Sequence, residues 1–236
     1  MLSFLGIGAQ KAGTTWLYEM LRQHPDLSFP AGKEVHFWDA NRQRGLDWYR
    51  AQFAGDDRRK AGEITPAYAI LPVETIEEIH RFDPTLRLIY IIRDPIRRAW
   101  SSALMALGRA EMQLEEASDQ WFIDHFLSAG SMKRGDYEQC LRNWRRVFDA
   151  ERLLVLRYDM VRENPLGLLR ACCAHLRVDE GWFQRVPPEG LRERVFGGNG
   201  QPIRPSLLPV LKEIYHPKVK SLGAYLGADL SGWLEA

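Results

Sequence analysis

The chain has 236 residues, of which 45% are hydrophobic and 27% are charged, and its formal net charge is +1. This length suffices for one well-buried α/β domain and does not require two, so we expect a single domain over residues 1–236. The near-neutral charge gives no global field that would draw the chain onto nucleic acid or an anionic membrane. Any site for an anion must therefore be local.

Strand-like and helical segments alternate along the chain, which predicts an α/β fold with a central, mainly parallel sheet flanked by helices. Asp94 and Pro95 predict the start of one helix, because Asp caps helix N-termini and Pro is favoured in the first turn. Residues 186–209 lack a clear period and predict a loop, and residues 207–233 predict two short helices. Apolar runs and helical periodicity predict strands at 2–7, 86–92 and 152–157 and helices at 14–23, 74–82, 137–148 and 165–176.

The segment after the first predicted strand has the composition of a phosphate-binding loop. Gly8 and Gly13 have the glycine spacing of G-x-x-x-x-G-K-[ST] loops, but Thr14 takes the place of the lysine and Lys11 lies inside the loop. A strand that turns sharply into a helix presents backbone N–H groups and the positive end of the helix dipole to an anion. The loop therefore predicts a P-loop-like anion site, and the displaced lysine favours sulfuryl transfer over nucleoside-triphosphate chemistry.

The chain resembles sulfotransferases that use 3′-phosphoadenosine 5′-phosphosulfate (PAPS). Residues 11–16, Lys-Ala-Gly-Thr-Thr-Trp, are similar to the 5′-phosphosulfate loop of that family. Residues 33–39, Lys-Glu-Val-His-Phe-Trp-Asp, resemble the E-V-H-F-F-D segment of its heparan sulfate (N-/3-O-) branch and imply a bacterial-type member. The resemblance covers roughly residues 4–165, and further matches follow in order at 45–49, 63–68, 91–95 with Ser101, and Tyr137 with Leu141, Trp144 and Phe148.

This resemblance implies in-line transfer of a sulfuryl group, with 3′-phosphoadenosine 5′-phosphate (PAP) as the nucleotide product. Lys11 would stabilise the negative charge that grows on the leaving phosphate. Because sulfate monoesters carry one charge less than phosphate monoesters, no metal ion is required in principle. Backbone amides and hydroxyls would hold the 5′-phosphosulfate, which gives the cofactor-binding set Lys11, Ala12, Gly13, Thr14, Thr15 and Trp16.

On the acceptor side, Glu34 matches the general base of the heparan sulfate branch. A carboxylate that returns to the cleft after the loop and helix can accept the proton of the acceptor. His36 and Asp39 match the same motif and would orient the base or the acceptor. We therefore expect Glu34, Lys11 and His36 to be the catalytic residues.

The 3′-phosphate requires a cationic pocket of its own, for which Arg93 and Ser101 are the candidates. Arg93 follows a predicted buried strand, and ligands of open α/β sheets bind beyond the carboxyl ends of strands. A guanidinium and a hydroxyl suit a phosphate dianion, and this Arg-to-Ser spacing resembles the 3′-phosphate motif of the family. Arg97 and Arg98 compete for the role, although the helical pattern predicts solvated positions for both.

Two parts of the resemblance leave alternatives open. Glu63, Thr65 and Tyr68 resemble a segment on the acceptor or cofactor side, and structural packing explains them equally well. The family closes its cofactor site with a Lys-Gly-Arg loop, whereas residues 196–201 here are Phe-Gly-Gly-Asn-Gly-Gln. Arg194 or Arg204 would then supply the missing positive charge.

Two other functions remain open from the sequence. A P-loop kinase would need a lysine at position 14, where Thr14 stands, and an aspartate after an apolar strand, for which Asp94 is the candidate. The second is a domain that binds a nucleotide but catalyses no reaction. Its only support is that residues 196–201 differ from the Lys-Gly-Arg loop of the family.

Partners and compartment follow from simpler features. We expect a glycan or small-molecule acceptor, with a hydroxyl or an amine, and neither nucleic acid nor membrane insertion. The cysteines, Cys140, Cys172 and Cys173, are odd in number and two are adjacent, which predicts buried free thiols and a reducing compartment. The chain shows no basic leader and no apolar run long enough to span a membrane, so we expect a cytoplasmic protein, although eukaryotic relatives of this branch are Golgi-anchored. Oligomeric state cannot be read from these features.

Overall fold

Five strands form one parallel sheet in the computed structural model, which describes residues 1–55, 58–192 and 200–235. The strand order is β2-β3-β1-β4-β5, and every neighbouring pair is parallel. The predicted α/β class with a central parallel sheet is confirmed. The strands are β1 (Leu2–Gly8), β2 (Leu27–Ser28), β3 (Lys60–Ile64), β4 (Arg87–Ile92) and β5 (Leu153–Arg157).

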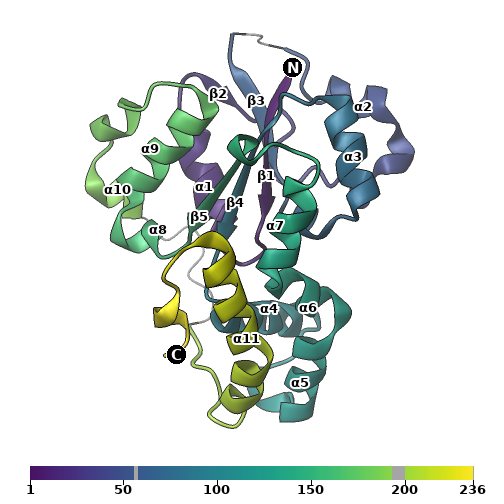
Figure 1. Ribbon diagram of the computed structural model, residues 1–236, viewed down its shortest axis with the longest axis vertical. Coiled ribbons are helices and arrows are strands. Elements are labelled where there is room, and N and C mark those ends of the chain that lie inside the picture. Colours follow the sequence, from purple (N-terminus) through teal and green to yellow (C-terminus); the bar gives the residue numbers. More distant parts are fainter. Residues whose placement is uncertain (56–57, 193–199, 236) are drawn as a thin grey trace. The chain divides into compact units, whose positions relative to one another are not determined.

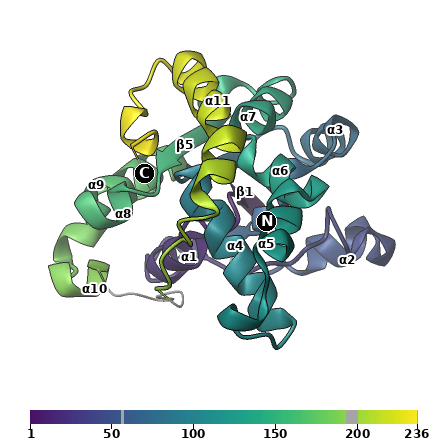
Figure 2. The ribbon, with the colours of Figure 1, turned by 90° about the horizontal axis from the view of Figure 1, so that it is seen from below.

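The described residues fall into two compact units, which we call the sheet unit (residues 1–92 and 143–196) and the helical unit (residues 93–142 and 197–236). In the sheet unit, α1 and α9 lie on one side of the sheet and α3 lies on the other (Figure 1). Helix α9 also contacts α8 and α10 (Figure 2). The helices of this unit are α1 (Thr14–Leu21), α2 (Leu46–Ala51), α3 (Val73–Phe82), α8 (Met160–Glu163), α9 (Pro165–Leu176) and α10 (Pro188–Arg192), with a 3₁₀ turn at Pro66–Ile70.

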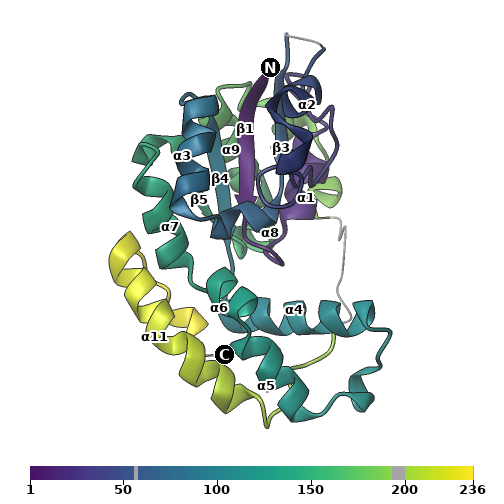
Figure 3. The ribbon, with the colours of Figure 1, turned by 90° about the vertical axis from the view of Figure 1, so that its right-hand side faces the viewer.

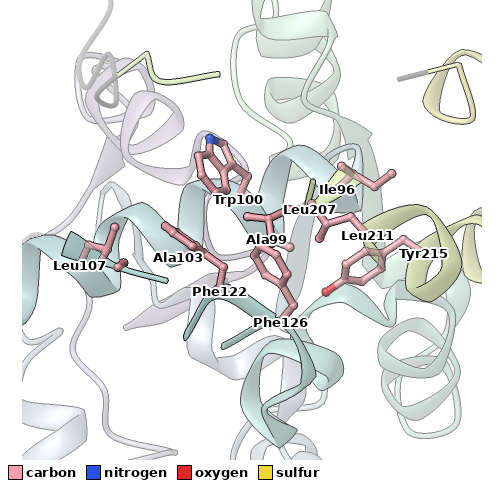
Figure 4. Packing of buried hydrophobic residues seen from close by; sticks show 11 residues of the cluster. Ile96, Ala99, Trp100, Ala103, Leu107, Phe122, Phe126, Leu207, Leu211 and Tyr215 are labelled. Atoms are coloured by element: carbon pink, nitrogen blue, oxygen red, sulfur yellow. The ribbon is translucent and has the colours of Figure 1, made fainter. Parts of the chain in front are cut away.

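The helical unit packs around α4 (Pro95–Arg109). This helix contacts α5 (Asp119–Leu127), α6 (Ala129–Gly135) and α11 (Leu208–Leu226), as can be followed in Figure 3. Helix α7 (Tyr137–Arg145) begins in this unit. Figure 4 shows the apolar side chains that α4, α5 and α11 contribute to one cluster, among them Ile96, Ala99, Trp100, Phe122, Phe126, Leu211 and Tyr215.

The N-terminus of α4 forms as the sequence predicts. The Asp94 side chain accepts hydrogen bonds from the backbone N–H groups of Ile96 (2.9 Å) and Arg97 (3.4 Å), and Pro95 occupies the first turn. These bonds satisfy two of the N–H groups that a helix start leaves without a partner.

The C-terminal prediction is wrong in two places. Residues 207–233 form one 19-residue helix, α11, followed by a 3₁₀ turn at Ser231–Trp233, rather than two short helices. Pro217 lies inside α11, where a proline removes one backbone hydrogen bond without ending the helix, because the apolar face of α11 is buried on both sides of it. The predicted loop at 186–209 contains the short helix α10. None of the helices in the described ranges combines the length and the apolar character needed to cross a membrane.

The three cysteines are free and buried, as expected from their number and spacing. Burial raises the pKa of the Cys173 thiol to about 12 and that of Cys172 further still. Thiols with such pKa values stay protonated and unreactive near neutral pH.

We predict that Gly62→Ala destabilises the sheet unit. A β-carbon at position 62 would overlap the ring of Phe4, which is fully buried. Overpacking of this kind costs about 1–3 kcal/mol of unfolding free energy, which urea denaturation measures. Gly108→Ala is the control, because a β-carbon there meets no atom within 4 Å. An unchanged unfolding free energy for Gly62→Ala would contradict the packing of Phe4 on β3.

Candidate functional site

The loop between β1 and α1 has a tightly constrained backbone. Gly13 has φ 82° and Lys11 has φ 67°, both in the left-handed region. A β-carbon at Gly13 would lie 2.8 Å from the ring of Tyr158, and one at Gly8 would lie 2.9 Å from Ala69 Cβ. Glycine is therefore required at both positions, by conformation at Gly13 and by close packing at both.

Tyr158 packs against this loop and was not singled out from the sequence. It directly follows β5, and its backbone N–H donates to the carbonyl of Ile92 at the end of β4 (2.8 Å). Because ligands of parallel sheets bind beyond the carboxyl ends of strands, its position after a strand is the signal that could have identified it.

The N-terminus of α1 is left available to an anion. Gly13 at the N-cap has no side chain to bond the first N–H groups, and no acidic residue lies in the first turn. Thr14 (6% exposed) and Thr15 (half-buried) are the first two residues of α1, which places their side chains at the helix start. Trp16 is buried, and its Nε1 donates to the carbonyl of Leu191 (3.0 Å), so its side chain serves packing and only its backbone remains for a ligand. An uncapped helix start with positive dipole suits a phosphate or sulfate.

The segment with Glu34 and His36 is anchored at the end of β3. The backbone N–H of Glu34 donates to the carbonyl of Ile64 (3.2 Å), and Ile64 is the register partner of Gly6 in β1. The N–H of Thr65 donates to the carbonyl of Gly6 (2.9 Å). The Lys11 loop leaves β1, and the Glu34 segment follows β2 and is bonded to the end of β3, which lies between β2 and β1. Both segments therefore lie at the carboxyl edge of the sheet.

The three predicted catalytic residues share an unusual backbone. Lys11 (φ 67°), Glu34 (φ 64°) and His36 (φ 55°) are three of the five non-glycine residues in the described ranges with positive φ. Such a conformation costs about 1–3 kcal/mol per residue and persists where surrounding contacts enforce it. Strained residues of this kind concentrate at functional sites, which supports the assignment of all three.

Four charged side chains form a continuous chain in this segment. Asp39 Oδ2 lies 2.9 Å from His36 Nδ1, and His36 Nε2 lies 3.3 Å from Glu34 Oε2. Lys33 Nζ donates to the other oxygen of Glu34, Oε1. Lys33 is a residue that the sequence analysis did not assign, although its position next to Glu34 was visible.

These contacts shift the pKa values of Glu34 and His36 in opposite directions. Burial raises the pKa of Glu34, but the hydrogen bonds and charges of Lys33 and His36 outweigh it, and the pKa lies below its usual range. Burial lowers the pKa of His36, but Asp39 and Glu34 outweigh that effect and raise it above the ordinary imidazole value. Glu34 is therefore a carboxylate near neutral pH.

The helical unit contains the predicted 3′-phosphate residues. Arg93 is its first residue and is half-buried, and Ser101 is half-buried on α4. Arg97 is exposed, as predicted. The predicted solvated position of Arg98 is wrong: this side chain is 0% exposed. Its Nη2 donates to the carbonyl and hydroxyl of Ser131 and to the hydroxyl of Tyr215, each at 3.2 Å.

The closing loop is described only in part. Arg194 and residues 196–199 lie outside the described residues. Arg204 donates to Asp119 (2.8 Å) and to the carbonyl of Leu114 (2.5 Å), so its guanidinium is engaged within the helical unit. A role for either arginine at the cofactor stays a prediction.

Glu63, Thr65 and Tyr68 are all 0% exposed. Complete burial favours packing over direct contact with an acceptor or cofactor, the two alternatives left open by the sequence. Within the described ranges, no group of three or more His, Cys, Asp or Glu side chains is arranged to hold a metal ion. That no metal is required stays a prediction.

Comparison with known proteins gives a consistent set of relatives. Residues 3–185 match the model of a family described as "Sulfotransferase domain". The chain is 32% identical over 167 residues to mouse heparan sulfate glucosamine 3-O-sulfotransferase 6, covering 68% of this chain and 48% of that protein. It is 31% identical over 170 residues to human heparan sulfate glucosamine 3-O-sulfotransferase 3B1, covering 69% of this chain and 43% of the relative. The chain thus spans about half the length of these relatives.

A solved structure matches over nearly the whole length. It is a sulfotransferase from Alicyclobacillus acidocaldarius, with a TM-score of 0.78 and 25% sequence identity. The match covers 99% of this chain and 98% of that one. The similarity therefore extends to the entire fold.

We predict that His36 titrates above the ordinary imidazole pKa of about 6.5. Asp39→Asn should lower this pKa, because it removes the charge that stabilises the imidazolium. NMR titration of the labelled imidazole measures it, and Asp47→Asn, at a side chain that is 99% exposed, is the control. Because the folded pKa is raised, the contribution of His36 to stability is present below the unfolded pKa and lost as pH rises through the folded pKa. A His36 pKa at or below 6.5 would contradict the contacts of its imidazole with Asp39 and Glu34.

Proposed function

The chain belongs to the sulfotransferase domain family, and we propose that it transfers a sulfuryl group from PAPS to a hydroxyl or amine of an acceptor. One observation carries the proposal: the Lys11 loop leaves β1, and the Glu34 segment is bonded to the carboxyl end of the adjacent parallel strand, β3. This arrangement supplies, at one edge of the sheet, a cation with an uncapped helix start and a segment that carries a carboxylate.

On the leaving side, the loop would hold the 5′-phosphosulfate of PAPS. The N–H groups at the start of α1 and the Thr14 and Thr15 hydroxyls suit its anionic oxygens, and Gly13 supplies the left-handed backbone from which the helix starts. Lys11 would stabilise the charge that develops as the bond between sulfur and the phosphate oxygen breaks. The nucleotide product is then PAP.

On the attacking side, Glu34 would act as the general base. The acceptor oxygen or nitrogen forms a bond to sulfur and loses its proton to the Glu34 carboxylate. Glu34 is ionised and so ready to accept a proton, and an acceptor that displaces water from it would raise its low pKa. His36 and Asp39 would keep the carboxylate oriented.

For the acceptor, we propose a glycan or another small molecule with a free hydroxyl or amine. The names of the 3-O-sulfotransferase relatives support a glucosamine-containing saccharide as the first class to test. We further propose that the chain works in the cytoplasm and takes PAPS without a metal ion.

We predict that the chain binds PAP at least about tenfold more tightly than AMP, since charge-assisted hydrogen bonds to the 3′-phosphate contribute about 1.5–3 kcal/mol each. Isothermal titration calorimetry measures both affinities. Arg93→Ala should reduce this preference, whereas Arg109→Ala, at an exposed residue of α4, should preserve it. Equal affinity for PAP and AMP would contradict the proposal of a pocket for the 3′-phosphate.

We predict that Glu34→Gln lowers kcat for sulfate transfer by about 10²–10⁴-fold, the usual contribution of a general base. Transfer from radiolabelled PAPS to a panel of saccharide, phenol and amine acceptors measures it. Affinity for PAP should stay within about threefold, because the carboxylate acts on the acceptor side; the same assay should show a loss of about 10²–10³-fold for Lys11→Ala. Glu111→Gln makes the same change at another exposed residue with positive φ, in the helical unit, and serves as the control. Full turnover by Glu34→Gln would show that the base is misassigned.

A further inference from the structure

A fully buried carboxylate, Glu63, lies in β3 beneath the Glu34 segment. Its Oε1 accepts hydrogen bonds from the hydroxyls of Tyr49 (2.5 Å) and Tyr68 (3.1 Å). Its Oε2 accepts from the Thr65 hydroxyl (2.6 Å) and from the backbone N–H of Val35 (3.3 Å). Four donors converge on one side chain that is 0% exposed, which is how a buried charge is made tolerable.

The same network continues into the backbone of the segment. The Tyr68 hydroxyl, which donates to Glu63, accepts hydrogen bonds from the N–H groups of Phe37 (2.9 Å) and Trp38 (3.4 Å). The Thr65 hydroxyl accepts from the N–H of His36 (3.5 Å). The four consecutive amides 35–38 are therefore all tied to Glu63, one directly and three through a hydroxyl.

These bonds act where the backbone is strained. Glu34 and His36 have positive φ, and each would relax to an ordinary conformation if the surrounding contacts were lost. The amides of residues 35–38 are held by the network, and that of Glu34 by the Ile64 carbonyl. No bond of this network reaches the Glu34 carboxylate itself, so its effect on that group is through the backbone alone.

We propose that Glu63 is a positioning residue for sulfuryl transfer, which holds Glu34 and His36 in place through Val35, Thr65 and Tyr68 without touching a substrate. This inference rests on the proposed function for its effect on the reaction. The proposal also gives a role to Glu63, Thr65 and Tyr68, which are too deeply buried to contact an acceptor.

The hydrogen-bond partners of Glu63 agree with this role. Burial raises the pKa of its carboxyl group above the usual range, and the hydrogen bonds from Thr65, Tyr49, Tyr68 and Val35 offset only part of that rise. All four partners use a hydrogen to bond the carboxyl oxygens, a set that an ionised carboxylate satisfies in full. Glu63→Ala would leave these donors without a partner and risks unfolding the chain, so it is not the variant of choice.

Two tyrosines provide a matched pair of variants. Tyr68→Phe and Tyr49→Phe each remove one buried hydroxyl that donates to Glu63 Oε1. Only the Tyr68 hydroxyl also accepts from the backbone of the segment. We expect both variants to lower the melting temperature, whereas only Tyr68→Phe should lower kcat substantially, by about 10²-fold, the effect of misplacing a reacting group by about 1 Å. KM for PAPS should be unchanged in both, because the nucleotide loop is outside the network. Equal kcat values in the two variants would overturn the proposal.

A second measurement tests positioning without turnover. The His36 imidazole makes no bond to the network, and its raised pKa depends on its distance from Asp39 and Glu34. Tyr68→Phe should bring the His36 pKa, measured by NMR, toward the ordinary imidazole value, and Tyr49→Phe should leave it raised. If the wild-type chain transfers no sulfate, the proposed function fails, and this titration still decides the positioning role. A His36 pKa that is the same in both variants and in the wild type would overturn that role.

Discussion

The site depends on the parallel pairing of β1 with β3 at their carboxyl ends. The hydrogen bond from the Thr65 N–H to the Gly6 carbonyl continues this pairing beyond the last residue of β3. The Lys11 loop leaves β1 two residues after Gly6, and the Glu34 segment is bonded to Ile64, the register partner of Gly6. A cationic loop and a segment with a carboxylate, more than twenty residues apart in sequence, thereby lie at one edge of the sheet, as the proposed transfer between two substrates requires.

The same edge combines strain with buried charge. Lys11, Glu34 and His36 adopt a backbone conformation that L-residues avoid, and Glu63 is an acid without exposure to water. Each feature would be unfavourable alone. Together they are consistent, because the hydrogen-bond donors that satisfy Glu63 include the amide of Val35 and hydroxyls that themselves accept the next three amides. The same hydrogen bonds thus stabilise the buried carboxylate of Glu63 and hold the strained backbone of the Glu34 segment.

Much of the fold was predictable because its signals are local. The β-branched run of β4 and the Asp94-Pro95 helix start were identified from neighbouring residues alone. Strand β3 was not, because Lys60–Ile64 contains a glycine and a glutamate in place of an apolar run, and its pairing comes from β1 and β2. Arg98 was misjudged for a related reason: a helical pattern does not reveal that Ser131 and Tyr215, which are distant in sequence, supply its hydrogen-bond acceptors.

The candidate catalytic residues were identified from a motif, but their structural surroundings could not be predicted from it. The motif around Glu34 gives residue types, whereas the left-handed backbone and the link to Glu63 depend on contacts with the end of β3. These contacts are made by backbone atoms and buried side chains. They fix the backbone around Glu34 and do not determine which acceptor binds. Exposed side chains near Asp39 and on α2 take no part in the hydrogen bonds that fix the Glu34 backbone. Acceptor choice can therefore differ between chains that share this edge, and it has to be determined from the surface and from transfer assays rather than from the motif.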